Sequence, residues 1–265
     1  MRTSRVRAGV VACAAATAVA LTGCASGGAP GHGVGAGSSV SATATATAPG
    51  TAALSGPDIL KRAREAGAAA SSFTMTFSFD PNRYGRVQAA LSGRLSWDRG
   101  GHCVGEVTLA GHGSAELVAS GTTMWVRPDA AFATAEFGPA AAATLSGKYL
   151  KGPVNDPRFA DLTGDTPGDD SSDLCRWGAF ELSIPDEGDE NAQKLGPTTV
   201  GGVHVVAVQT VGKGSYTAYI ATEGTPYAIR LGDRPGLSFT DYGRPVAFRV
   251  PPAAQTFDLS RVPRS

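Results

Sequence analysis

Hydrophobic and polar residues alternate most clearly along residues 72–80. Apolar side chains take every second position of this stretch: Phe73, Met75, Phe77 and Phe79. Because successive side chains of a strand point to opposite faces, the spacing predicts a β-strand with one apolar face. A second alternating run covers residues 87–97, and Asp80-Pro81-Asn82 provides a turn between the two runs. The pattern therefore predicts an antiparallel pair.

Helical patterns interrupt two groups of strands. Ser55 and Asp58 bracket Pro57, which predicts a helix through residue 70, and residues 130–145 predict a helical region broken at Gly138-Pro139. Further extended segments are expected at residues 103–109, 114–120, 123–127, 147–153, 199–211, 215–221, 226–231, 236–241 and 246–250. Closely connected strands are antiparallel, and helices grouped between two meanders pack on one face, so the fold class is α+β.

The N-terminus has the three-part layout of an export signal. Three arginines precede an apolar run at residues 8–21, and small residues follow before Cys24. The run is about 14 residues long, too short to cross a bilayer as a helix. No later apolar run reaches about 18 residues, so no membrane-spanning segment is expected.

Leu21-Thr22-Gly23-Cys24 resembles the lipobox of bacterial lipoproteins. The resemblance implies cleavage before Cys24, a diacylglycerol on its thiol, and often a further acyl group such as palmitate on the new amino group. Two or more acyl chains hold a protein stably on a membrane. The alternative is an ordinary signal peptide with a chance cysteine. The sequence thus predicts a lipid-anchored protein on the outer face of the cytoplasmic membrane.

Composition divides the chain into three parts. Residues 1–23 are the expected signal peptide, and residues 24–55 hold the lipidated cysteine and a tether rich in Gly, Ala, Ser, Thr and Pro. Such a tether cannot bury enough apolar area to order itself. A glycine-rich run at residues 33–37 has no flanking strand or helix, so a phosphate-binding loop is not expected. Residues 56–265 are long enough for one domain with a substantial core.

Charge gives no reason to expect a nucleic-acid partner. The 265 residues carry 23 Lys or Arg and 23 Asp or Glu, and the expected signal removes three arginines and no acid. The remaining surface is mildly acidic, so neither nucleic acid nor an anionic membrane surface is an expected electrostatic partner.

Two cysteines remain for the fold once Cys13 leaves with the signal and Cys24 is lipidated. Cys103 and Cys175 form an isolated pair, which predicts a disulfide in an oxidising compartment. Two free buried thiols are the alternative. A metal site is less favoured, because neither cysteine has a Cys or His partner at the usual short spacing.

The common catalytic and metal-binding motifs are absent from the sequence. The sequence lacks Ser-x-x-Lys and Lys-Thr-Gly, and Gly113-Ser114-Ala115 is not a nucleophile elbow. The histidines have no ligand spacing, and the acidic runs at residues 165–173 and 186–190 do not fit a calcium loop. A carboxylate pair for glycoside hydrolysis cannot be located. We therefore expect no catalytic residues, no metal, no cofactor and no enzyme activity.

Several local motifs resemble the LppX/LprG-type lipoproteins of actinobacteria, which are related in fold to the LolA and LolB carriers. The motifs are Thr123-Met124-Trp125-Val126-Arg127-Pro128, Gly147-Lys148-Tyr149-Leu150-Lys151, Pro226-Tyr227-Ala228-Ile229-Arg230 and Asp241-Tyr242-Gly243-Arg244-Pro245-Val246. The resemblance implies a strongly curved antiparallel sheet, a half-open β-barrel, with helices covering its concave face and an apolar cavity between them. Members of the family carry or present acylated lipids outside the membrane.

The expected function follows from this resemblance. The protein would bind or carry an acyl lipid as a membrane-tethered lipoprotein, with residues 130–145 as a moving lid. The candidate cavity-lining residues are Phe73, Met75, Phe77, Phe79, Leu91 and Leu95. Methionine suits a variable guest because its side chain is adaptable. The alternative is a filled core, in which these residues only pack under the helices and the protein is an envelope interaction or sensor module. The protein partner is not predicted.

Overall fold

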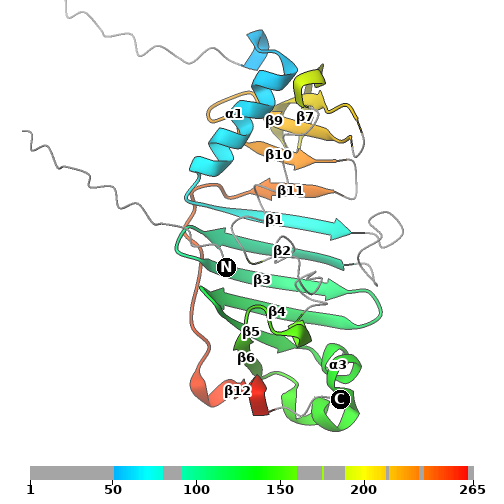
Figure 1. Ribbon diagram of the computed structural model, residues 1–265, viewed down its shortest axis with the longest axis vertical. Coiled ribbons are helices and arrows are strands. Elements are labelled where there is room, and N and C mark those ends of the chain that lie inside the picture. The colour runs from blue at the N-terminus through cyan, green and yellow to red at the C-terminus, as the bar shows by residue number, and fades with distance from the viewer. Residues whose placement is uncertain are drawn as a thin grey trace, which may run out of the picture. The chain divides into compact units, whose positions relative to one another are not determined.

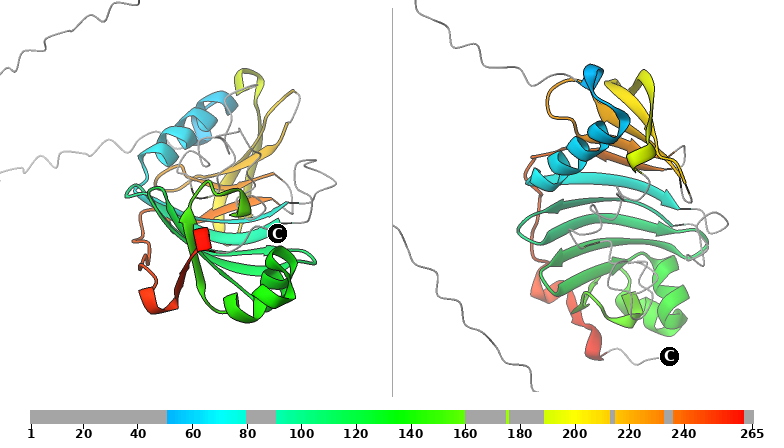
Figure 2. Two further views of the ribbon diagram at one scale, coloured as in Figure 1. Left: turned by 60° about the horizontal axis from the view of Figure 1, so that its bottom comes forward. Right: turned by 45° about the horizontal axis from the view of Figure 1, so that its top comes forward.

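The computed structural model describes residues 51–79, 91–159, 175, 189–212, 215–232 and 236–261. In this part of the chain twelve strands form one sheet, in the order β12-β6-β5-β4-β3-β2-β1-β11-β10-β9-β8-β7 (Figure 1). Their bounds are β1 Ser72–Phe79, β2 Leu91–Asp98, β3 His102–Leu109, β4 Gly113–Ser120, β5 Thr123–Pro128, β6 Tyr149–Pro153, β7 Gln193–Val200, β8 Val203–Gln209, β9 Thr217–Ala221, β10 Ala228–Leu231, β11 Leu237–Thr240 and β12 Thr256–Asp258. The sheet is curved and unclosed, as two further views also show (Figure 2).

Two antiparallel meanders make up this sheet. β1 to β6 follow one another in space as in sequence, and so do β7 to β11. The meanders join where β1 pairs with β11, with Thr74 opposite Thr240. The short β12 adds a parallel pairing to β6, which the sequence did not indicate. The expected α+β class with a curved, mostly antiparallel, half-open sheet is confirmed.

Two α-helices accompany the sheet, α1 (Gly56–Ala69) and α3 (Ala130–Leu145). The Ser55 hydroxyl accepts a hydrogen bond from the Asp58 amide at 3.3 Å, so α1 begins with the cap expected from its sequence. The apolar side of α1 contacts β7 to β10, and α3 contacts β4 and β5. Short 3-10 helices lie at Thr51–Ala53 (η1), Pro157–Phe159 (η2), Asp189–Asn191 (η3), Ala253–Gln255 (η4) and Leu259–Arg261 (η5). None of the helices in these ranges is long and apolar enough to cross a membrane.

The break inside α3 lies where the sequence placed it. Gly138 has φ 79 and ψ 162, and Pro139 follows, so two helical pieces meet at a kink. The Asp129 carboxylate caps the first piece by accepting a hydrogen bond from the Phe132 amide at 2.7 Å.

Two expected strands differ in the structure. Residues 199–211 were predicted as one strand, but the chain turns back at Gly201-Gly202, so β7 and β8 form a hairpin with Val200 opposite Val203. Both glycines have positive φ, 56° and 83°, the geometry of a tight two-residue hairpin turn. Residues 246–250 were predicted as a strand, but they belong to no ladder.

Instead, residues 244–252 form an extended segment that we call the C-terminal strap. It starts beside β1, where the Ser72 hydroxyl donates to the carbonyl of Arg244 at 2.6 Å. Its Phe248 packs on a small apolar cluster of Val118, Trp125 and Tyr149, on the face of the sheet opposite the main core. The alternation at residues 246–250 therefore reflects packing against a sheet face rather than pairing with a strand.

Candidate functional site

The expected lining residues share the concave face of the sheet. Met75 pairs with Leu95 across β1 and β2, and Phe73 pairs with Trp97. The exposed fractions are 2% for Phe73, 3% for Met75, 2% for Phe77 and 0% for Leu95, and all four belong to the main core. The side chains of Phe79 and Leu91 and all of Cys24 lie outside the described residues.

The second meander and α1 complete this core. Phe73 stacks on Trp97 with ring centroids 5.0 Å apart and meets the edge of Phe239, from β11, at 6.1 Å. Other contributions come from residues that the sequence did not single out: Ile59 and Leu60 of α1, Val206 and Val208 of β8, and Ile220 of β9. The continuous apolar run Val205–Val208 in β8 is a signal that could have identified Val206 and Val208, since a short apolar run is typical of a strand buried on both faces.

Small residues on the concave face leave room that other side chains occupy. A Cβ atom on Gly93 would lie 2.8 Å from Cζ of Phe77 and 3.1 Å from Cγ1 of Val107. The Phe77 ring therefore lies over the glycine. At 0–3% exposure, the four expected lining residues with described side chains are closely packed.

The expected disulfide is present, since Cys103 and Cys175 are bonded with Cα atoms 5.5 Å apart. Cys103 is fully buried on the concave face, between Trp97 of β2 and Ala119 of β4 in the register. Because a disulfide fixes its partner within a few ångströms, Cys175 also lies on this face. The bond thus attaches a residue from between β6 and β7 to the middle of the first meander.

The two helices contact different parts of the sheet. The main contacts of α1 are with β7 to β10, and those of α3 are with β4 and β5. The most aromatic part of the concave face, on β1 and β2, lies between these two areas (Figure 1). Of α3, only Phe132, Ala133, Ala142 and Leu145 are buried.

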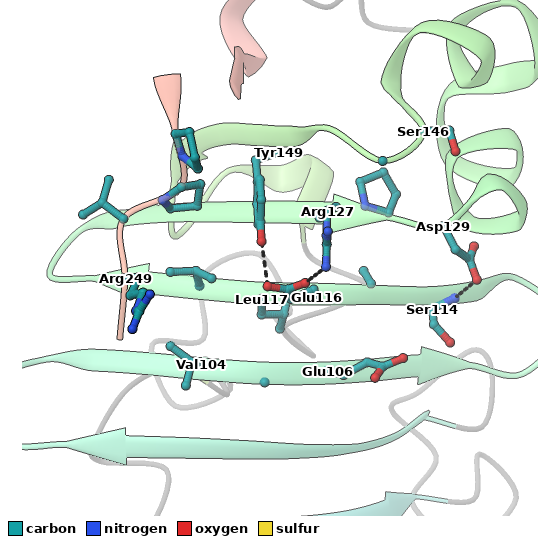
Figure 3. A pocket seen from close by; sticks show the side chains of 18 of the residues that line it. Val104, Glu106, Ser114, Glu116, Leu117, Arg127, Asp129, Ser146, Tyr149 and Arg249 are labelled. Atoms are coloured by element: carbon teal, nitrogen blue, oxygen red, sulfur yellow. Dashed lines mark hydrogen bonds and ion pairs between the residues drawn. The ribbon is translucent and has the colours of Figure 1, made fainter. Parts of the chain in front are cut away.

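A second candidate site is a pocket of about 1200 Å³ on the opposite, outer face (Figure 3). Its floor is formed by β3, β4 and β5. The C-terminal strap forms one wall, and the start of α3 and residues 146–149 contribute the other. No local sequence pattern predicts this pocket, because its walls come from segments far apart along the chain.

Four charged residues cross the floor of this pocket in one register row. Arg94 pairs with Glu106, Glu106 with Glu116, and Glu116 with Arg127 on successive strands. Two of them are engaged within the row itself, since Arg127 donates to the Glu116 carboxylate. Arg94 instead donates to Asp241 at 2.9 Å. The two glutamates lie side by side on this floor and do not face each other across a cleft.

Tyr149 completes the network around Glu116. Its hydroxyl donates to Glu116 Oε1 at 2.6 Å, and its ring is only 8% exposed. Burial raises the pKa of Tyr149, and the hydrogen bond to Glu116 raises it further. Glu116 therefore accepts two hydrogen bonds, and its carboxylate is held in place as a link between β4, β5 and β6.

Metal-binding chemistry finds no support in the described ranges, where no three His, Cys, Asp or Glu residues gather closely enough to hold an ion. His102 pairs with Asp98 at 2.9 Å and stacks on Phe248 at 4.1 Å. The expected acidic loops at residues 165–173 and 186–190 lie outside the described residues except for Asp189 and Glu190, which belong to η3.

Comparisons with known proteins bear on the fold. No family model and no curated protein matches the sequence. Among solved structures, the chain is similar to LprF from Mycobacterium bovis, with 16% identity, 74% of this chain and 96% of that chain covered, and a TM-score of 0.46. The chain is also similar to the Mycobacterium tuberculosis lipoprotein LppX, with 11% identity, 73% of this chain and 97% of that chain covered, and a TM-score of 0.44.

A third similar structure is the MucA/MucB complex of Pseudomonas aeruginosa, with 14% identity, 71% of this chain and 55% of that chain covered, and a TM-score of 0.32. LppX, whose family the sequence motifs resemble, is one of these solved structures. At these identities and TM-scores the similarity transfers no activity to this chain.

Proposed function

We propose that the protein is a membrane-tethered extracytoplasmic lipoprotein that binds or carries an acylated lipid against the concave face of its sheet. The observation that carries the proposal is the position of the apolar residues of β1 and β2 in an unclosed sheet, between the contact areas of α1 and α3. A lipid chain placed there gains about 25 cal/mol for each Å² of apolar surface removed from water.

The export signal and the Leu-Thr-Gly-Cys motif support the location. An anchor at Cys24 would hold the domain on the outer face of the cytoplasmic membrane, where acylated lipids are close at hand. The disulfide between Cys103 and Cys175 agrees with an oxidising compartment.

Entry of a lipid requires a movable element, because the four lining residues whose side chains are described, Phe73, Met75, Phe77 and Leu95, are packed at 0–3% exposure. We assign this role to α3, which lies against β4 and β5 beside this part of the face and would widen it by moving away. Its kink at Gly138-Pro139 divides it into two short pieces, and few of its residues are buried. Short helices gain most of their stability from packing, so displacing a sparsely buried helix costs the least free energy.

A second candidate function is favoured by the same burial values. If the concave face stays closed, the protein is an envelope interaction or sensor module with a filled core. Its contacts would then be made on the surface, where the outer-face pocket offers paired charges and an apolar strap.

Native mass spectrometry separates the two. The compact unit Thr47–Ser265, purified from a lipid-containing host, should carry an acyl lipid of fixed stoichiometry that organic extraction recovers. Phe77→Asp should abolish the adduct, whereas Thr76→Asp, on the exposed opposite face of β1, should leave it intact. A folded Phe77→Asp variant that still binds lipid, or a protein that takes up no added phospholipid, would favour the closed module.

A further inference from the structure

Exposed apolar side chains are concentrated on the β7–β8 hairpin. In the part of the chain that the structure describes, the large apolar residues that are exposed are Leu195 (60%), Val203 (39%), Val211 (43%) and Val250 (60%). The first three lie along the hairpin, in β7, at the start of β8 and just beyond its end, over about 26 Å. Val250 lies instead on the strap, at the outer-face pocket.

β7 itself packs against little. It is an edge of the described sheet, and none of its eight residues is buried. Scattered apolar residues on a surface need no explanation, but three on one edge hairpin form an apolar rim that the described residues leave exposed.

The start of the domain is fixed to the same hairpin. Lys194 Nζ, from β7, donates to the carbonyl oxygens of Thr51 at 3.0 Å and Leu54 at 3.4 Å. A Cβ atom on Gly56 would lie 2.3 Å from the carbonyl oxygen of Ala192, so the first turn of α1 is packed tightly against the residue before β7. The chain that arrives from Cys24 therefore enters the domain at this hairpin (Figure 1, Figure 2).

We infer that the rim of Leu195, Val203 and Val211 docks on the membrane that holds the lipid anchor. The inference rests on the proposed anchor at Cys24 and adds an orientation to it. About 26 residues separate Cys24 from Thr51, and a chain of that length and composition has an r.m.s. span of about 28 Å. A short tether keeps a weakly binding surface at an effective concentration near the millimolar range.

Apolar contact, and not charge, drives this docking. Asp189 and Glu190 lie in η3, two residues before β7, and the ammonium group of Lys194 is engaged by backbone carbonyls. Apolar side chains gain from contact with acyl chains whatever the headgroup charge, so the docking is expected on neutral phosphatidylcholine.

The test uses the full lipidated chain in phosphatidylcholine vesicles with brominated acyl chains, which quench nearby tryptophan fluorescence. Leu195→Trp is the reporter, and Val250→Trp is the matched control because both positions are 60% exposed. Insertion of the rim to the headgroup boundary should quench the added Leu195→Trp emission about twofold, measured against the unsubstituted chain. Val203→Trp is a second reporter if the first variant unfolds.

Vesicle flotation is measured on the same samples. Chains that float, with Leu195→Trp quenched and Val250→Trp unquenched, support the docking. Chains that float with both reporters quenched equally, or with neither quenched, overturn the docking and leave the anchor intact. If the chain does not float with the vesicles, the proposed anchor is overturned, and the docking with it.

Discussion

Tyr242 shows how one residue with a polar group can connect two strands of this domain. Its hydroxyl donates to the carbonyl of Ala228 at 2.7 Å, which connects the end of β11 to the start of β10. Its ring lies parallel to that of Tyr227 at 3.9 Å and contacts Phe73 at 6.2 Å. Burial raises the pKa of Tyr242 well above the ordinary value of 10.0, with a further contribution from Tyr227. The phenol therefore stays neutral in the fold at pH values where a free tyrosine ionises.

This raised pKa predicts a loss of stability at alkaline pH. The stabilisation by the neutral phenol is complete below about pH 10 and is lost as the pH rises toward the folded-state pKa, because only the unfolded chain ionises in that range. Tyr242→Phe should lower the free energy of unfolding by about 1 kcal/mol at pH 7 through the lost hydrogen bond. The variant should then lose less stability than the wild type between pH 9 and pH 11, measured by urea unfolding at each pH. Parallel curves for the two proteins would contradict the assignment.

At the scale of elements, the C-terminal strap shows what hydrophobic periodicity does and does not reveal. Val246, Phe248 and Val250 alternate with other residues as in a strand, yet they join no ladder. Phe248 stacks on His102, with a centroid distance of 4.1 Å and an interplanar angle of 20°, and packs on the outer cluster. Alternation in the sequence predicts an extended backbone. It does not predict whether a neighbouring strand pairs with that backbone by hydrogen bonds.

The strap should depend on this one ring. Phe248→Ala removes the stacking and part of the outer cluster, and should lower the free energy of unfolding by about 1–2 kcal/mol. Val250→Ala, at a position 60% exposed on the same segment, should change it by less than about 0.5 kcal/mol. Chemical denaturation of both variants checks the prediction. Equal losses of unfolding free energy in the two variants would mean that residues other than Phe248 fix the strap to the sheet.

The sequence predicted the parts of the fold that local pattern determines. The period-two run identified β1 and its apolar face, the Ser55 cap located α1, and Gly138-Pro139 located the kink in α3. It could not reveal that the Phe77 ring covers Gly93, since this contact depends on the register of two strands. The outer-face pocket was unpredictable for the same reason, as its walls meet only in the folded chain.

At the scale of the whole domain, the disulfide joins β3 to a residue that belongs to none of the described strands. Cys103 lies inside the first meander, and Cys175 comes 72 residues later in the sequence. Closing a loop of that size restricts the unfolded chain, which stabilises the folded state by roughly 4 kcal/mol in the chain-entropy model.

Removal of the bond should therefore have a large effect. Cys103→Ala combined with Cys175→Ala should lower the free energy of unfolding of the unit Thr47–Ser265 by roughly 4 kcal/mol, measured with guanidinium chloride. A reductant should destabilise the wild type by a similar amount and leave the double variant unchanged, because the unit has no other cysteine. A wild type indifferent to reductant would show that the bond does not form in solution.

The pairing of β1 with β11 also governs the order of folding. β1 is the first strand of the domain, yet one of its two neighbours is Leu237–Thr240, close to the C-terminus. Contacts so distant in sequence form slowly, because a long loop must close before they contribute. Until β11 arrives, β1 presents an open edge with its aromatic side chains uncovered. The newly made chain thus remains unfinished, and prone to pair with other chains, until almost all of it is available.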